Sequence, residues 1–139
     1  MNATKLKVFS KIVIDISELS KDPRQKVGAL ILRPDLSICS MGYNGFPKGF
    51  PDDMDVWNNK ELKLKIVKHA EENALDFSRD QDMVGYSLIV THFPCSLCAG
   101  HIVQKGIKKI YYLIEPNNKE DFSISKLIFD ECKVEYFRI

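Results

Sequence analysis

Two short motifs limit what this chain can fold into more than any other part of its sequence. The first is His69-Ala70-Glu71, and the second is Pro94-Cys95-Ser96-Leu97-Cys98. One imidazole and two thiols form a donor set that suits Zn²⁺, provided that the fold brings the two motifs together. Three protein ligands leave a fourth tetrahedral position for water. That arrangement is typical of catalytic zinc sites, whereas structural sites usually have four protein ligands.

Each motif stands where a helix is predicted to begin. Cys95 directly precedes a helix expected over residues 96–105, so free backbone N–H groups and the helix dipole favour the thiolate form of both cysteines. Glu71 follows His69 by two residues, which lets its carboxylate face a water molecule at the open position without binding the metal. The pattern H-x-E with P-C-x-x-C is typical of zinc-dependent nucleobase deaminases. We therefore expect His69, Cys95 and Cys98 to bind zinc and Glu71 to be the catalytic residue that transfers protons.

Other interpretations of these residues are open at this stage. A lone Cys-x-x-Cys can also be a redox pair of the thioredoxin type. A closed structural zinc site would need a fourth ligand, and the candidates are His92, His101, Cys39 and Cys132. We expect His92 near the rim of the pocket, His101 on a helix face, and the two further cysteines in the core. Taken alone, Glu71 would be an ordinary acidic residue in the first turn of a helix.

The rest of the chain alternates between helical and extended patterns, which predicts an α/β fold. Its 139 residues suit one domain spanning 1–139. The segment 44–57 is rich in Gly and Pro but carries aromatic residues, so we expect an ordered irregular loop there. Helices are predicted over 6–19, 59–77 with a break near Lys68, 96–105 and 123–129. Strands are predicted over 27–32, 37–43, 86–91, 107–114 and 132–139.

Composition excludes several classes of protein. The formal net charge is +1, which argues against a nucleic-acid partner, because domains that bind nucleic acids are usually clearly basic. No stretch is long and apolar enough to span a membrane. The N-terminal residues lack the pattern of a signal peptide, so we expect a cytoplasmic protein whose cysteines are reduced.

Several motifs together resemble the deoxycytidylate (dCMP) deaminase branch of the cytidine deaminase superfamily. The resemblance covers nearly the whole chain. It is carried by Ser20-Lys21-Asp22-Pro23, Lys26-Val27-Gly28-Ala29, Gly42-Tyr43-Asn44-Gly45-Phe46-Pro47-Lys48-Gly49, Asp52-Asp53, His69-Ala70-Glu71-Glu72-Asn73-Ala74, Phe93-Pro94-Cys95-Ser96-Leu97-Cys98-Ala99 and Gly106-Ile107-Lys108-Lys109-Ile110. The zinc motif is specific for the superfamily, and the Asn44 loop with Asn73 points to this branch.

The resemblance implies a three-layer α/β/α sandwich with a central five-stranded mixed sheet. It implies hydrolytic deamination of dCMP to dUMP and ammonia, which supplies dUMP for thymidylate synthesis, and a homohexamer. Many relatives respond to dCTP and dTTP, so these nucleotides are possible effectors. Only Cys39, and no His, precedes the H-A-E motif, so we expect one zinc ion and no second, structural one.

The resemblance also suggests residues that bind the substrate. Asn44 is expected to bind the sugar, the Ala70 backbone to meet the base, and the turn at Phe93 and Pro94 to pack beside the base. The phosphate needs cations, for which Arg24 and Lys26 are the main candidates. Lys48 and Arg79 are further candidates, whereas Lys105, Lys108 and Lys109 are expected on the surface.

Three other functions compete with dCMP deamination. One is deamination of a different small molecule, such as cytidine, deoxycytidine or guanine. Another is deamination of adenosine in tRNA, against which the low net charge argues. The third is a zinc-binding module without catalytic activity, because a fold alone does not grant a function.

Overall fold

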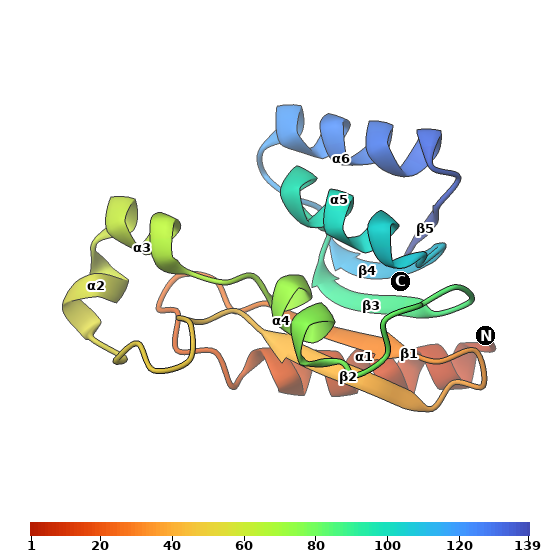
Figure 1. Ribbon diagram of the computed structural model, residues 1–139, viewed down its shortest axis with the longest axis horizontal. Coiled ribbons are helices and arrows are strands. Elements are labelled where there is room, and N and C mark those ends of the chain that lie inside the picture. Colours follow the sequence, from red (N-terminus) through yellow and green to blue (C-terminus); the bar gives the residue numbers. More distant parts are fainter.

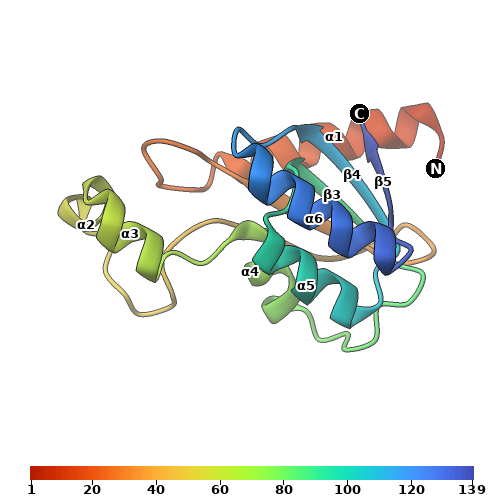
Figure 2. The same ribbon diagram turned by 90° about the horizontal axis from the view of Figure 1, so that it is seen from above.

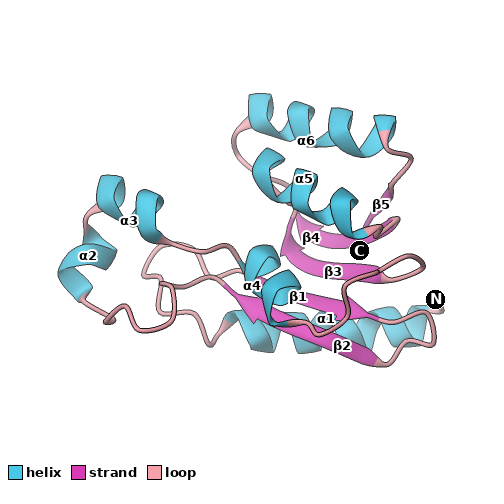
Figure 3. Ribbon diagram, viewed as in Figure 1, coloured by secondary structure: helices cyan, strands magenta, loops and turns pink.

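The computed structural model describes residues 1–139 and contains a five-stranded sheet with helices on both of its faces (Figures 1 and 3). The strand order is β2-β1-β3-β4-β5. The strands are β1 (Gly28–Leu32), β2 (Ile38–Tyr43), β3 (Ser87–His92), β4 (Lys109–Ile114) and β5 (Glu135–Arg138). The helices are α1 (Ala3–Ser17), α2 (Met54–Asn58), α3 (Lys60–Ile66), α4 (Ala70–Phe77), α5 (Ser96–Lys105) and α6 (Lys119–Glu131).

The sheet is mixed, as expected. Strand β1 pairs antiparallel with both β2 and β3, whereas β3, β4 and β5 run parallel to one another. All five residues of β1 are buried, because this strand has a neighbour on each side and a helix layer on each face. The parallel half brings the ends of β3 and β4 to one edge of the sheet, where ligands bind in open α/β sheets.

Helices cover the sheet in two layers (Figure 2). Val13 and Ile16 of α1 form a small core with β1 and β3 on one face. Helices α4, α5 and α6 cover the other face over a larger core that includes Ile102 and the fully buried Phe129. The predicted three-layer α/β/α sandwich is therefore confirmed.

Helices α2 and α3 form an arm that extends from the sandwich (Figure 1). The expectation of irregular structure over 44–57 was wrong at its end, because α2 begins at Met54. Asp53 starts this helix by accepting a hydrogen bond from the Asp55 N–H. Trp57 of the arm packs against the loop that follows β2. Its indole is buried and stacks on Phe46, with ring centroids 3.9 Å apart.

The predicted break near Lys68 is confirmed, because α3 ends at Ile66 and α4 begins only at Ala70. Helix α6 is longer than predicted and starts at Lys119. The Asn118 side chain accepts a hydrogen bond from the Asp121 N–H and so begins this helix earlier than the apolar pattern indicates. No helix has the length and apolar character that crossing a membrane requires.

Candidate zinc and nucleotide site

Three predicted metal ligands meet between the first turns of α4 and α5. The Nδ1 atom of His69 lies 3.4 Å from the Cys95 sulfur and 3.3 Å from the Cys98 sulfur. All three donor atoms lie within 4.8 Å of one another. The fold therefore brings the His69 imidazole to two thiols that lie 26 and 29 residues further along the sequence.

The donor set fits a tetrahedral zinc ion. Zn–N bonds of about 2.0–2.1 Å and Zn–S bonds of about 2.3 Å place the nitrogen and sulfur atoms of a tetrahedral site about 3.6 Å apart. The observed N–S separations of 3.3 and 3.4 Å are close to that value. His69, Cys95 and Cys98 are thus positioned to bind one metal ion and to leave one coordination position free.

The polypeptide fixes these ligands through the caps of two helices. His69 is the extended residue before α4, and its N–H donates to the Glu72 carboxylate over 3.1 Å. The same carboxylate forms a 2.9 Å ion pair with Lys68. Cys95 is the extended residue before α5, which places Cys98 in the first turn of that helix. Each ligand therefore belongs to a helix end with defined geometry.

Hydrogen bonds between the ligands shift their pKa values. The Cys98 thiol and the His69 ring lower the pKa of Cys95 to about 4, while the Cys95 thiolate raises the pKa of His69 to about 9. The hydrogen bond to Cys95, together with burial, raises the pKa of Cys98. The site therefore stabilises one thiolate by itself, and a dication between the three groups would stabilise the second.

An acidic residue of α6 also anchors the zinc-binding turn. The Asp121 carboxylate accepts hydrogen bonds from the Ser96 backbone N–H over 3.2 Å and from the Ser96 hydroxyl over 2.6 Å. Ser96 directly follows Cys95 and is the first residue of α5. Asp121 thus fixes the backbone beside a predicted ligand, as groups around a metal site commonly do.

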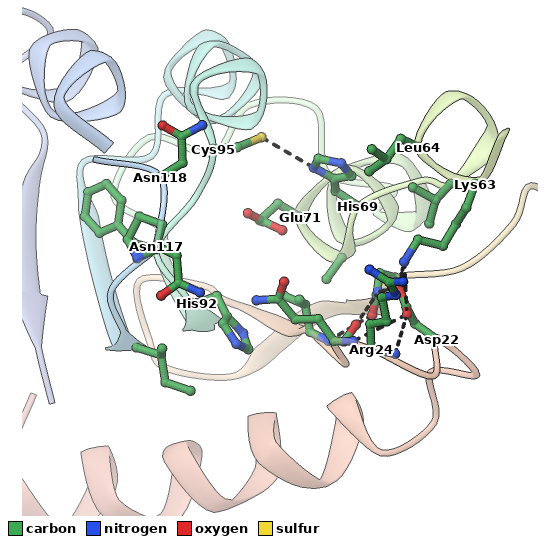
Figure 4. A pocket seen from close by; sticks show the side chains of 18 of the residues that line it. Asp22, Arg24, Lys63, Leu64, His69, Glu71, His92, Cys95, Asn117 and Asn118 are labelled. Carbon is green, nitrogen blue, oxygen red and sulfur yellow. Dashed lines mark hydrogen bonds and ion pairs between the residues drawn. The ribbon is translucent and has the colours of Figure 1, made fainter. Parts of the chain in front are cut away.

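Glu71 lies beside the ligand cluster and lines a cavity of about 700 Å³ (Figure 4). Its side chain points into this cavity, in which His69, Cys95 and His92 also take part. Only 5% of the residue is exposed, and burial raises the pKa of its carboxyl to about 7. A carboxyl with this pKa both accepts and returns protons near neutral pH.

Comparison with known proteins identifies the family. Residues 3–114 match the family described as the cytidine and deoxycytidylate deaminase zinc-binding region. The chain belongs to this family. The match includes all three ligands and Glu71, which agrees with one zinc ion as the cofactor of the site.

Individual relatives point to the same branch of the deaminase family. An uncharacterized deaminase of Aliivibrio fischeri is 38% identical over 93% of this chain and 89% of its own length. Human deoxycytidylate deaminase is 33% identical over 92% of this chain and 75% of its own. The crystal structure of dCMP deaminase from cyanophage S-TIM5 in complex with dCMP and dUMP is 29% identical, with a TM-score of 0.81. That match covers 100% of this chain and 99% of the phage protein.

The substrate residues expected in this deaminase lie in different surroundings. Asn44, Ala70, Phe93 and Arg24 all line the cavity. The ring of Phe93 is part of the core, where it packs edge-on against Tyr112, Phe122, Phe129 and Tyr136. Pro94 is buried and does not belong to the cavity lining.

The candidate cations for the phosphate also differ in whether they line the cavity. Lys26 lies outside the cavity lining, and its ammonium is 3.7 Å from the Glu18 carboxylate. Lys48 lies over the Phe77 ring and lines a second cavity of about 480 Å³, whereas Arg79 lines neither cavity. Lys105, Lys108 and Lys109 also lie outside both linings.

The other His and Cys residues do not join the ligand cluster. His92 lines the cavity, where its Nδ1 is 2.9 Å from the Thr91 hydroxyl and burial lowers its pKa. His101 is exposed on α5. The Cys39 sulfur lies 3.2 Å from the Ser78 hydroxyl, and Cys132 packs against the large core.

Sequence reasoning missed a group of cavity residues from the loop before β1, from the arm and from the loop after β4. The arm contributes two lysines, and a buried carboxylate faces one of them. A helical pattern around residue 60 was visible, but no local signal indicated that it would reach the cavity. The missed residues include Asp22, Lys60, Lys63, Leu64, Val67, Glu115, Pro116, Asn117 and Asn118.

Proposed function

We propose that this chain catalyses zinc-dependent hydrolytic deamination of dCMP to dUMP and ammonia, and that it supplies dUMP for thymidylate synthesis. The observation that carries the proposal is the placement of a buried carboxylate, Glu71, beside a three-ligand metal site inside a cavity. The volume of this cavity, about 700 Å³, is within the range of cavities that bind small organic ligands. The dCMP deaminases of human and of cyanophage S-TIM5 support dCMP as the substrate.

His69, Cys95 and Cys98 would hold a zinc ion, and this ion would lower the pKa of a water molecule so that it can attack C4 of the cytosine ring. Glu71 accepts a proton from the attacking water. It delivers this proton to N3 of the ring, then accepts the second proton from the hydroxyl group now on C4 and delivers it to the amino group on C4. The C4–O bond forms, the C4–N bond breaks, and ammonia leaves. Because burial disfavours the charged form of Glu71, its carboxylate accepts a proton more readily than an exposed one, and a pKa of about 7 still lets the carboxyl return that proton near neutral pH.

The cavity also offers groups for the remainder of dCMP. We assign the sugar to Asn44 and the base to the Ala70 backbone and Phe93, with Pro94 as the buried residue of the same turn. For the phosphate we assign Arg24 and, in place of Lys26, which lies outside the cavity lining, Lys60. Both line the cavity, and neither takes part in an ion pair.

We further propose that residues 1–139 act as one catalytic domain in the cytoplasm and that copies of the chain assemble into a hexamer. Ile38 and Met41 of the edge strand β2 are about half exposed, which supports burial of this edge between copies. Regulation by dCTP and dTTP is proposed from the family resemblance. Sedimentation velocity with and without dCTP tests the assembly, and a monomer under both conditions would contradict it.

Ammonia release from a substrate panel tests the proposed function. The panel contains dCMP, CMP, deoxycytidine, cytidine and guanine at equal concentrations. We expect dCMP to be the best substrate, and deoxycytidine to react at least tenfold more slowly because it lacks the phosphate. Equal rates for dCMP and deoxycytidine would contradict the phosphate assignment, and release from guanine alone would replace the proposed substrate.

A further inference from the structure

A buried ion pair in the wall of the cavity takes no part in the chemistry described above. The Lys63 ammonium lies 3.2 Å from each oxygen of the Asp22 carboxylate, and the two residues are only 6% and 5% exposed. Figure 4 shows Lys63 of α3 pointing to Asp22 beside the cavity. Burying both charges costs hydration energy, and such pairs often add little to stability. Its position suggests that it orients other groups.

The carboxylate of Asp22 connects several parts of the cavity wall. It accepts hydrogen bonds from the backbone N–H groups of Arg24 over 2.9 Å and of Gln25 over 3.3 Å. It also accepts one from the side-chain amide of Asn44 over 3.3 Å. A single buried group therefore joins the loop before β1, the residue after β2 and the arm helix α3.

These contacts define the orientation of the Asn44 amide. Its oxygen faces the Val27 backbone N–H over 2.9 Å, and its nitrogen faces the Gln25 carbonyl over 2.9 Å. Because a backbone N–H only donates and a carbonyl only accepts, the positions of oxygen and nitrogen are fixed. Asp22 takes the second N–H of the amide. Asn44 is left with one oxygen lone pair, so it can only accept a hydrogen bond from a ligand.

We propose that Asp22 and Lys63 are positioning residues that make Asn44 an obligatory hydrogen-bond acceptor for the 3′-hydroxyl of the substrate. Lys63 pairs with both oxygens of the Asp22 carboxylate, and this carboxylate holds the amide nitrogen of Asn44 away from the ligand. Through this contact, the arm helix α3 helps to select substrates that carry a sugar hydroxyl. The proposal rests on the proposed function, because it requires a deoxynucleotide in the cavity.

The test compares dCMP with 2′,3′-dideoxycytidine monophosphate, which lacks the 3′-hydroxyl. In the zinc-loaded wild-type enzyme we expect kcat/KM to be about tenfold higher for dCMP, the value of one good hydrogen bond. In Lys63→Met we expect KM for dCMP to rise about tenfold, with kcat within twofold and zinc content unchanged. The dideoxy substrate should be nearly unaffected, so the ratio of the two kcat/KM values should approach one.

Two further variants separate positioning from stability. Asp22→Asn/Lys63→Met buries no charge, so it should unfold near the wild-type temperature. It should still lose the discrimination, because the backbone N–H groups of Arg24 and Gln25 retain the oxygen of the new amide and leave its nitrogen facing the nitrogen of Asn44. Lys65→Met is the matched control, since Lys65 is an exposed lysine on the same helix, and it should keep the wild-type ratio.

Two results would overturn the positioning role. One is that Lys63→Met and Asp22→Asn/Lys63→Met both keep the tenfold ratio of kcat/KM between dCMP and the dideoxy substrate. The other is that these variants lose kcat/KM equally for both substrates. A wild-type enzyme that does not deaminate dCMP would instead refute the proposed function.

Discussion

Gly42 of β2 lets helix α4 lie directly on the sheet, so Gly42→Ala should disturb the active site. A Cβ atom at residue 42 would lie 2.3 Å from the Ala70 carbonyl oxygen and 2.5 Å from the Ala74 nitrogen. Both contacts are with backbone, so no side-chain rotation relieves them. Ordinary contact begins near 3.4 Å, so helix and strand must separate by about 1 Å.

The shift should reach the site because Ala70 lies between His69 and Glu71. A displacement of about 1 Å at a catalytic group costs on the order of 100-fold in rate. Overpacking of this kind should also lower the free energy of unfolding by about 1–3 kcal/mol. Steady-state kinetics with dCMP and urea unfolding of the zinc-loaded protein measure the two effects.

Gly100→Ala is the control for Gly42→Ala. Gly100 belongs to α5, and a Cβ atom there would meet nothing within 4 Å. This variant should keep its activity and gain about 0.5–1 kcal/mol in stability, because alanine favours a helix. A Gly42→Ala enzyme with wild-type kcat/KM would refute the inference that the contact between β2 and α4 positions Glu71.

Three further variants test the proton transfer, the anchoring of the zinc-binding turn and the packing of the core. Glu71→Gln should keep zinc and lose about 10²–10⁴-fold in kcat, which metal analysis and ammonia release can measure; wild-type kcat would mean that another group moves the protons. Asp121→Asn should weaken zinc binding about tenfold in a chelator competition, since Asp121 anchors the turn at Ser96. Glu120→Gln, on the same helical turn, should bind zinc normally, and equal affinities in both variants would exclude anchoring. Phe129→Ala should lower the unfolding free energy by about 3–5 kcal/mol in urea titration, because Phe129 is fully buried; a loss under 1 kcal/mol would contradict its role in the core.

The zinc site could be predicted because its determinants are local. Pro94 and Cys95 stand between a strand and a helix, Cys98 lies in the first turn of that helix, and His69 stands at a break between two helices. Motifs at helix starts after neighbouring strands converge on one edge of an α/β sheet. The order of the elements, together with the family resemblance, was therefore enough to bring Glu71 to the ligands.

The remainder of the cavity could not be predicted from the sequence, because it depends on contacts between residues that are far apart along the chain. Asp22 and Lys63 are 41 residues apart, and neither lies in a pattern that indicates a buried charge. Arg24 and Lys26 look equivalent in the sequence, but only Arg24 lines the cavity. Arg24 and not Lys26 faces the cavity because of the turn between them and Asp22. The Asp22 carboxylate holds this turn by accepting hydrogen bonds from backbone N–H groups.

X-ray absorption at the zinc edge can establish whether three protein side chains bind one zinc ion and leave a fourth position for water. The protein as purified, with its metal content measured on the same sample, should contain one zinc per chain. Its spectrum should show two sulfur atoms at about 2.3 Å and two nitrogen or oxygen atoms at about 2.0–2.1 Å, of which one comes from histidine. A third sulfur, a second histidine nitrogen or a protein without metal would contradict the claim.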